Sequence, residues 1–200
     1  MKMGKYRLMV VEDESILRMD IKEMLIEAGY DVVAEANSGD KAIELADLHK
    51  PDLIVMDIKM PKMNGIKASR IIYQAFQIPS LLLTAYSERD LVEEAKNAHI
   101  LGYLVKPVSE NSLIPAAEIA LAQANRLKAL AYDIKKMEEK IQDQKVIQRA
   151  KGILMEVNQV SEEQAFKMLR SHSMNHGKTM RAVADSILLH RKLESDVTAV

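Results

Sequence analysis

The 200-residue chain contains no cysteine and no tryptophan. Without cysteine it can form neither disulfides nor thiolate zinc sites, and cysteine usage does not indicate whether its compartment is oxidising or reducing. Aromatic residues make up only 4% of the chain, so a core must be built from Leu, Ile, Val, Met and Ala. Five prolines and seven glycines, beside 48% apolar and 28% charged residues, indicate a folded soluble protein. The length suits one well-buried domain and a smaller module.

Long apolar runs are also missing. None approaches the roughly 18–20 residues that a membrane span requires. The opening stretch MKMGKYRLMVVEDE runs into acidic residues and does not resemble a signal peptide. We therefore expect a cytoplasmic protein without a membrane partner.

Charge is distributed unevenly behind a formal net charge of -1. Residues 1–115 hold 14 Lys and Arg against 18 Asp and Glu, a net of -4, whereas the remaining 85 residues hold 14 against 11, a net of +3. Between Gln123 and Arg181 there are 12 basic and seven acidic residues, a net of +5. The basic half is a candidate for binding a polyanion.

Five short apolar runs recur in the first half at intervals of about 20–25 residues, separated by stretches with helical spacing. The runs are YRLMVV (6–11), DVVAEA (31–36), DLIVMD (52–57), PSLLLT (79–84) and GYLVK (102–106). Alternating strands and helices with unbroken apolar strands predict an α/β fold, a doubly wound parallel sheet of five strands covered by helices on both faces.

Polar residues end four of these runs, and ligands bind at the carboxyl ends of strands in such sheets. The residues are Glu12 and Asp13 after the first run, Asp57 ending the third, Thr84 ending the fourth and Lys106 ending the fifth. Taken singly, Asp57 could be a turn residue or a helix cap. Together they predict a site in which Mg²⁺ sits among carboxylates, and a carboxylate attacks a phosphoryl group whose oxygens the cations neutralise.

The segments VVEDE, IVMDIKMPKMNG, LLLTAY and GYLVKP resemble the motifs of the response-regulator receiver domain of two-component signalling, across residues 1 to about 122. The resemblance implies a phosphorelay with a sensor histidine kinase as donor. It implies that Asp57 is the phospho-acceptor, that Glu12, Asp13, Asp57 and the backbone carbonyl of Lys59 bind Mg²⁺, and that Lys106 pairs with the phosphoryl oxygens. It further implies a cis Lys106–Pro107 bond, which proline makes accessible.

Two further residues would form the switch that the resemblance implies. Thr84 would hydrogen-bond the phosphoryl group, and Tyr103 would turn inward with it. An aspartyl phosphate adds roughly two negative charges. We expect this local change to repack the surface formed by the fourth helix, the fifth strand and the fifth helix.

A long helix is predicted from Leu113 onward, because no glycine occurs before Gly152 and no proline after Pro115. Apart from an interruption at Gln123, its apolar or small residues follow alternating three- and four-residue steps, and the uninterrupted part covers about two heptads. The residues are Leu113, Ala116, Ala120, Leu127, Leu130, Ile134, Met137 and Ile141. This heptad seam predicts a parallel coiled-coil dimer. The alternative is an amphipathic helix packed on its own chain. We expect three parts: a receiver (1–122), a coiled-coil linker helix (123–146) and a small all-α domain of three helices (147–200).

The last third contains the end of the long helix and two further helices. Ser161 and Gln164 have the spacing of a capping box, and a turn follows around NHGK. Phe166 is expected in the core of this part, and the alternative is a platform on which a base stacks. His172 and His176 are four residues apart but have no third partner that would make a metal site.

The stretch AKGILMEVNQVSEEQAFKMLRSHSMN, followed by VADSI, resembles the ANTAR output domain, an RNA-binding antiterminator module, over residues 148–188. Ser173 stands where that family commonly has alanine. Basic side chains would bind phosphates, and single-stranded loop bases would supply sequence information. The candidates for the RNA face are Arg149, Lys151, Arg170, Lys178 and Arg181, and His172 and Asn175 could reach base edges or backbone.

The leading hypothesis is a response regulator that dimerises when phosphorylated and binds tandem stem-loops in a leader transcript, which prevents transcription termination. An alternative keeps the receiver and makes the output a DNA-binding transcription factor. A third class, a Mg²⁺-dependent phosphatase with Asp57 as nucleophile, would need a second acid two residues later, where Lys59 stands. We therefore expect a regulator and not an enzyme.

Overall fold

The computed structural model describes residues 6–85 and 100–198, with side chains up to Arg191. The predicted fourth helix falls in residues 86–99, outside the described residues. Backbone packing separates two units, Met1–Lys128 and Ala129–Val200. In the described part of the chain, no helix is long and apolar enough to cross a membrane.

The first unit contains a five-stranded parallel sheet in the order β2-β1-β3-β4-β5. Its strands are β1 (Arg7–Val11), β2 (Asp31–Ala36), β3 (Leu53–Asp57), β4 (Ser80–Thr84) and β5 (Ile100–Val105). Each lies within two residues of an apolar run in the sequence. The predicted fold class, a doubly wound sheet joined to a helical part by a long helix, is confirmed.

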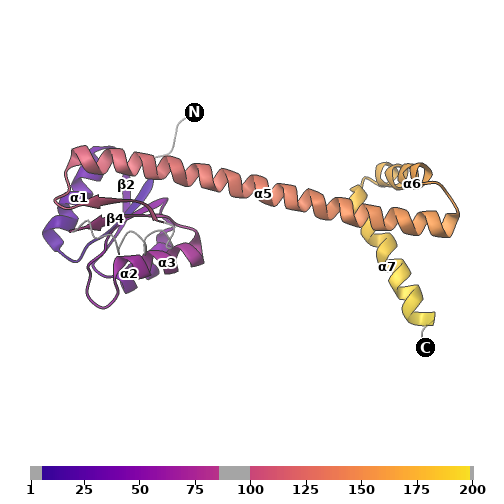
Figure 1. The fold of residues 1–200 in the computed structure, drawn as a ribbon, viewed down its shortest axis with the longest axis horizontal. Coiled ribbons are helices and arrows are strands. Elements are labelled where there is room, and N and C mark those ends of the chain that lie inside the picture. Colours follow the sequence, from indigo (N-terminus) through magenta and orange to yellow (C-terminus); the bar gives the residue numbers. More distant parts are fainter. Residues whose placement is uncertain (1–5, 86–99, 199–200) are drawn as a thin grey trace. The chain divides into compact units, whose positions relative to one another are not determined.

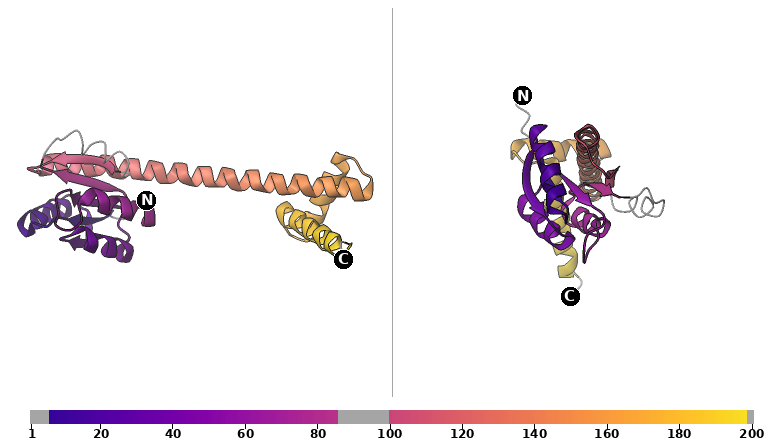
Figure 2. Two further views of the ribbon diagram at one scale, coloured as in Figure 1. Left: turned by 60° about the horizontal axis from the view of Figure 1, so that its bottom comes forward. Right: turned by 90° about the vertical axis from the view of Figure 1, so that its left-hand side faces the viewer.

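Helices cover both faces of the sheet because alternate strand residues point to opposite faces. Met9 and Val11 pack with α2 (Gly39–His49) and α3 (Gly65–Phe76) on one face. Leu8 and Val10 pack with α1 (Ser15–Glu27) and the first turns of α5 (Glu110–Asn158) on the other. Figures 1 and 2 show α2 and α3 together on one side of the strands. β3 and β4 are buried throughout, so the centre of the sheet is a rigid support for whatever its edge carries.

Polar caps set where the helices of this sheet begin. Asn64 precedes α3, and its side chain accepts a hydrogen bond from the Lys67 backbone N–H at 2.8 Å. Ser38 caps α2 in the same way through the Lys41 backbone N–H. Such caps satisfy N–H groups that have no partner within the helix. They fix the loops after β2 and β3, and the loop after β3 follows Asp57.

The helix α5 runs for 49 residues, Glu110–Asn158, and the two ends of the predicted heptad seam differ. Leu113 and Ala120 are buried against the sheet, so the alternative of a helix packed on its own chain holds for these first turns. The later residues are about half exposed or more: Leu127, Leu130, Ile134, Met137 and Ile141. We call these five residues the exposed seam. It covers two heptads, about 21 Å of helix at 1.5 Å per residue.

The second unit packs α6 (Glu162–Asn175) and α7 (Met180–Thr198) on the end of α5 around Ala150, Leu169, Val183 and Ala184. The predicted capping box is confirmed: Ser161 accepts from the Gln164 backbone N–H, and the Gln164 side chain accepts from the Ser161 backbone N–H. The prediction that Phe166 is a core residue was wrong, because 39% of it is exposed. The ring instead lines a surface groove together with Lys151.

Candidate functional site

Three carboxylates meet at the carboxyl edge of the sheet. Glu12 and Asp13 directly follow β1, and Asp57 ends β3; the two strands are neighbours and parallel, so these ends lie side by side. Each of the three residues offers a carboxylate oxygen within 4.8 Å of the others. Glu12 is fully buried and Asp57 almost so, whereas Asp13 is exposed. The site is a half-buried acidic cluster that opens to solvent on the Asp13 side.

Lys106 enters this cluster from the end of β5. Its Nζ lies 2.8 Å from Glu12 Oε2 and 2.9 Å from Asp57 Oδ1, and 18% of its side chain is exposed. The backbone N–H of Lys106 donates to the Thr84 carbonyl at 2.7 Å, which ties the loop to β4. The Lys106–Pro107 peptide bond is cis, as the sequence resemblance implied. One cation thus bridges two of the three carboxylates.

Burial dominates the electrostatics of the cluster. It raises the pKa of Asp57, and the hydrogen bond from Lys106 offsets this only in part while Asp13 adds to it. It also raises the pKa of Glu12 against the hydrogen bond from Lys106, with Asp57 adding to the effect. Burial lowers the pKa of Lys106, but its hydrogen bonds to Glu12 and Asp57 outweigh this, so the pKa of Lys106 lies above its usual value. One lysine does not neutralise three acids, and the cluster has unmet affinity for positive charge.

The cluster fits a hard cation such as Mg²⁺, which takes oxygen ligands. Glu12 Oε1 is buried and has no hydrogen-bond partner, a costly state for a carboxylate oxygen that a cation would relieve. Asp13 gives the exposed side on which water could complete the ligand shell. Lys59 lies in the loop two residues after Asp57, with its side chain exposed. A ligand role for its backbone carbonyl stays a prediction.

The two predicted switch residues occupy different environments. Thr84 ends β4 and is buried next to the cluster, since its neighbour Leu83 pairs with Asp57 in the sheet. Tyr103 lies on β5, opposite Leu82, and is half exposed. The structure therefore brings Thr84 to the acidic edge and leaves Tyr103 half exposed on β5, in register two residues before Thr84.

Gly65 and Arg18 also shape the site, and motif reading did not assign them a role. A Cβ atom on Gly65 would lie 2.0 Å from the carbonyl oxygen of Asp57, so only glycine lets α3 start this close to the acidic edge. The Arg18 guanidinium donates to the Glu12 carbonyl at 2.6 Å and holds the loop after β1. Gly65 is the last residue of the motif IVMDIKMPKMNG, and this glycine is the one sequence signal of the close approach between α3 and the end of β3. Arg18 left no recognisable signal in the sequence.

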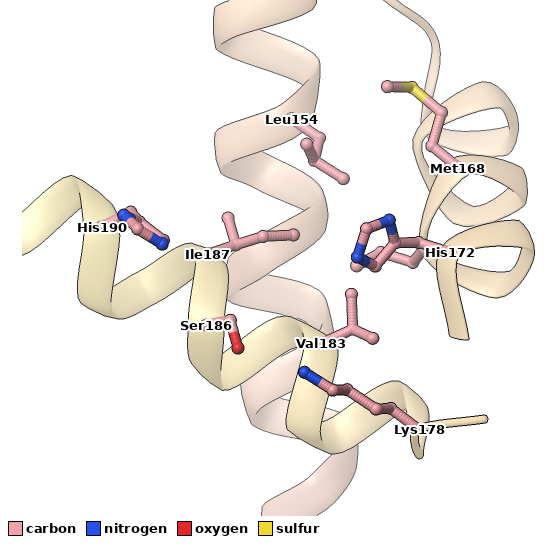
Figure 3. A pocket seen from close by; sticks show the side chains of 9 residues that line it. Leu154, Met168, His172, Lys178, Val183, Ser186, Ile187 and His190 are labelled. Atoms are coloured by element: carbon pink, nitrogen blue, oxygen red, sulfur yellow. The ribbon is translucent and has the colours of Figure 1, made fainter. Parts of the chain in front are cut away.

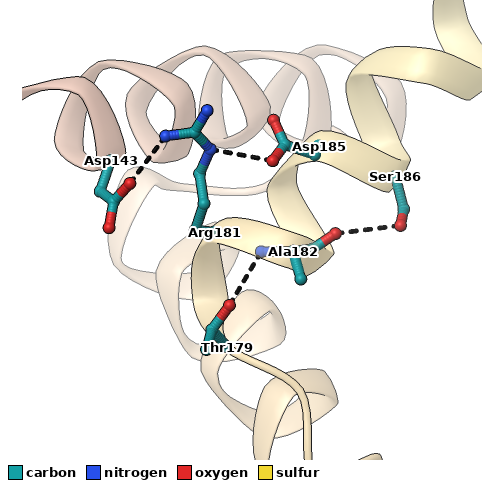
Figure 4. A network of polar contacts seen from close by, with 6 residues as sticks. All are labelled: Asp143, Thr179, Arg181, Ala182, Asp185 and Ser186. Atoms are coloured by element: carbon teal, nitrogen blue, oxygen red, sulfur yellow. Dashed lines mark hydrogen bonds and ion pairs between the residues drawn. The ribbon is translucent and has the colours of Figure 1, made fainter. Parts of the chain in front are cut away.

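The five predicted RNA-binding residues divide into two groups in the second unit. Lys151 is buried and its Nζ lies 2.6 Å from Glu162 Oε1. Arg181 lies between two carboxylates, 2.7 Å from Asp143 and 2.8 Å from Asp185, as Figure 4 shows. In the described part of the chain, Arg149, Arg170 and Lys178 are exposed and make no ion pair.

Location separates them further. Arg149 and Lys151 line a groove together with Lys145, and Lys178 lines a different cavity between α5, α6 and α7. The structure thus does not gather the five side chains in one place. It pairs two of them with acids and leaves three exposed.

Comparisons with known proteins cover both units. Residues 8–118 match the family model of the response regulator receiver domain, and residues 135–188 match that of the ANTAR domain. Transcriptional regulatory protein PdtaR of Mycobacterium tuberculosis is 43% identical over 182 residues, which cover 91% of this chain and 89% of that protein. Chemotaxis protein CheY of Bacillus subtilis is 37% identical over 112 residues, 56% of this chain and 93% of that protein.

A solved structure, a two-component response regulator of the LuxR family from Aurantimonas sp. SI85-9A1, is 34% identical with a TM-score of 0.56. The match covers 60% of this chain and 87% of the chain in that structure. The sheet order, the acidic cluster and the bridging lysine define a receiver domain. The chain belongs to the response regulators, and its receiver domain is followed by an ANTAR domain.

Proposed function

We propose that this response regulator is controlled by phosphorylation at Asp57 and, when phosphorylated, dimerises and binds tandem hairpins in leader RNA to prevent transcription termination. One observation carries the proposal: a single chain joins the acidic cluster and its lysine to an ANTAR domain. The ANTAR match favours RNA over the alternative of a DNA-binding output. Both matched families are regulatory, which supports a signalling role over a metabolic one.

Asp57 is the proposed phospho-acceptor. A carboxylate oxygen of Asp57 attacks the phosphorus of a phosphohistidine on a sensor kinase. The P–N bond breaks and the imidazole leaves as a neutral ring, which keeps the proton on its other nitrogen. Lys106 Nζ, 2.9 Å from Asp57 Oδ1, is close enough to bind a phosphoryl oxygen. The Thr84 hydroxyl, buried beside Asp57, donates to another oxygen once the phosphoryl group is in place.

Glu12, Asp13 and Asp57, with the backbone carbonyl of Lys59, are the proposed ligands of Mg²⁺. The unpartnered buried oxygen of Glu12 and the exposed carboxylate of Asp13 support this assignment. When bound, the ion supplies positive charge that offsets the acids and the incoming phosphoryl group. The chain itself holds the carboxylates in place through β1, β3 and the Arg18 hydrogen bond to Glu12.

The proposed response to phosphorylation passes from Thr84 to Tyr103 and then to α5. The new charge draws Thr84 toward the phosphoryl group, and the half-exposed Tyr103 turns into the space beside it. We propose a division into a receiver (1–122), a coiled-coil linker (123–146) and an RNA-binding domain (147–200). The exposed seam of α5 is the surface through which two copies pair.

Phosphate labelling tests the acceptor assignment. We expect wild-type chain to be labelled by a small phospho-donor such as acetyl phosphate with Mg²⁺, and Asp57→Ala to lose the label. Asp47→Ala is the matched control, because Asp47 is an exposed acid on α2. It should be labelled like the wild type. Label that persists in Asp57→Ala would refute the assignment.

A further inference from the structure

A cavity of about 290 Å³ lies between α5, α6 and α7 in the ANTAR unit. Its floor is apolar and buried or half-buried, formed by Leu154, Leu169, Val183 and Ile187. Its rim is exposed and polar, formed by His172, Lys178, Ser186 and His190. The volume is near the lower end of small-molecule sites, which run from about 300 to 1,000 Å³. It suits one flat ring system rather than a helix.

The polar groups at the rim share one electrostatic character. None of the nine residues that line the cavity is acidic, and three of them, His172, Lys178 and His190, carry nitrogen groups that can bind an anion. In the described part of the chain, Lys178 makes no ion pair, in contrast to Lys151 and Arg181. A rim of this kind complements a phosphate beside an apolar ring.

His172 supplies a surface on which a ring can stack. Figure 3 shows its imidazole projecting from α6 into the cavity, facing Leu154 and Ile187. The ring of His176 stacks on it with centroids 4.1 Å apart, which restricts its orientation. A held imidazole above an apolar floor is the arrangement in which an unpaired base gains both stacking and burial.

From these contacts we propose that the cavity receives one unpaired nucleobase from each RNA hairpin loop, with Lys178 binding the adjoining phosphate. The proposal rests on the proposed RNA-binding function and deepens it. His172 stacks on the base, and His190 and Ser186 lie at the rim where base edges pass. The residues that select the RNA sequence then line the cavity between α5, α6 and α7, and they do not include the ion-paired Lys151 and Arg181.

The test uses full-length chain with beryllium fluoride and Mg²⁺, and a two-hairpin RNA that the wild type selects from a pool with randomised loops. Each loop nucleotide is replaced in turn by an abasic one, and affinity is measured at fixed salt. We expect one position in each loop to lose about tenfold or more on base removal. Ser186→Phe, which fills the cavity from its rim, should lose about as much on intact RNA and nothing further at that abasic position.

Leu189→Phe is the matched control, because Leu189 is exposed on the same helix and does not line the cavity. It should bind like the wild type. A second pair, Lys178→Ala against Lys167→Ala, compares a rim lysine with an exposed lysine paired to Glu163 on α6. Only Lys178→Ala should weaken binding, and circular dichroism confirms that every variant is folded.

The outcomes separate the two proposals. If the wild type selects no hairpin RNA, the proposed function fails and the base pocket falls with it. If the wild type binds but Ser186→Phe binds equally well, or its loss adds fully to that of the abasic position, only the pocket is refuted. If free mononucleotides saturate the cavity and hairpins do not displace them, the ligand is a nucleotide and the assignment to RNA loops is overturned.

Discussion

At the scale of single residues, the acidic cluster lowers the stability of the folded receiver, because folding buries carboxylates there. The carboxyl groups of Glu12 and Asp57 are buried, and Lys106 is the one cation in the described part of the chain that forms an ion pair with either of them. Burying a charge without a full partner costs free energy. A site of this kind is maintained for binding, and removing one of its charges should stabilise the metal-free fold.

We predict that Asp57→Asn raises the free energy of unfolding of the metal-free receiver near neutral pH, on the order of 1 kcal/mol. Burial raises the pKa of Asp57, so between the usual and the raised value the folded chain holds more protons than the unfolded chain. Wild-type stability therefore falls as pH rises through that window, and the cost is fully present above it.

Thermal unfolding without metal, from pH 4 to pH 8, checks this. The advantage of Asp57→Asn should grow with pH, and added Mg²⁺ should stabilise the wild type more than the variant. A variant that is less stable than the wild type at pH 7 would show that the ion pair with Lys106 outweighs the cost of burial.

Gly65 gives a second prediction at this scale. Gly65→Ala places a Cβ 2.0 Å from the Asp57 carbonyl, so the start of α3 must shift away from the site. We expect a loss of roughly 1–3 kcal/mol in stability and slower labelling of Asp57. Gly152→Ala is the control: nothing lies within 4 Å of its added Cβ in α5, and it should stabilise that helix by about 0.5–1 kcal/mol. Equal labelling rates in the two variants would contradict the packing argument.

The sequence predicted which polar residues meet at the edge, because a parallel sheet brings its carboxyl strand ends together. It did not predict the distances that make Lys106 a bridge between Glu12 and Asp57, which depend on side-chain packing. The role of Gly65 was not predicted either. The only trace in the sequence of the close approach between the backbones of Gly65 and Asp57 is the glycine itself.

At the scale of elements, α5 combines two environments in one helix. Its first turns bury Leu113 and Ala117 against the sheet, and its middle leaves the exposed seam uncovered. Exposed apolar residues in heptad register are typical of a surface that pairs with another helix. A heptad pattern does not show where α5 stops packing on the sheet, because a sheet and a second helix both require the same apolar spacing.

Ile134→Glu should therefore prevent pairing, because it places a charge in the centre of the exposed seam. We expect beryllium fluoride with Mg²⁺ to raise the dimer fraction of the wild type in light scattering and to leave Ile134→Glu monomeric. Tyr132→Glu is the control, since Tyr132 is 67% exposed on α5 and lies outside the seam. A dimer that forms equally in Ile134→Glu would exclude the seam, and an unchanged wild-type mass would exclude the switch.

At the scale of the whole molecule, a basic second half follows an acidic first half, but net charge did not reveal which cations are available. Internal pairs occupy two of the five predicted RNA-binding residues: Lys151 contacts Glu162, and Arg181 contacts Asp143 and Asp185. These partners lie up to 38 positions away in the sequence, so only the fold could place them. A phosphate that binds Arg181 would have to compete with both carboxylates.

Salt dependence separates the two groups of basic residues. Arg170→Ala should weaken RNA binding and reduce the slope of log affinity against log salt by about 1, because a free phosphate contact is lost. Arg181→Ala should change that slope by less than half as much and lower the stability of the second unit instead. Titrations at three or more salt concentrations decide between them, and equal slopes for both variants would show that Arg181 binds RNA phosphates despite its ion pairs.

The most direct measurement is the affinity of full-length chain for a two-hairpin RNA, with and without beryllium fluoride and Mg²⁺, at one fixed salt concentration. We predict that the phosphate mimic tightens binding at least about tenfold, and that Asp57→Ala abolishes this gain, because two paired ANTAR domains bind the hairpins together. Equal affinity of the treated and untreated wild type would contradict control of RNA binding by Asp57.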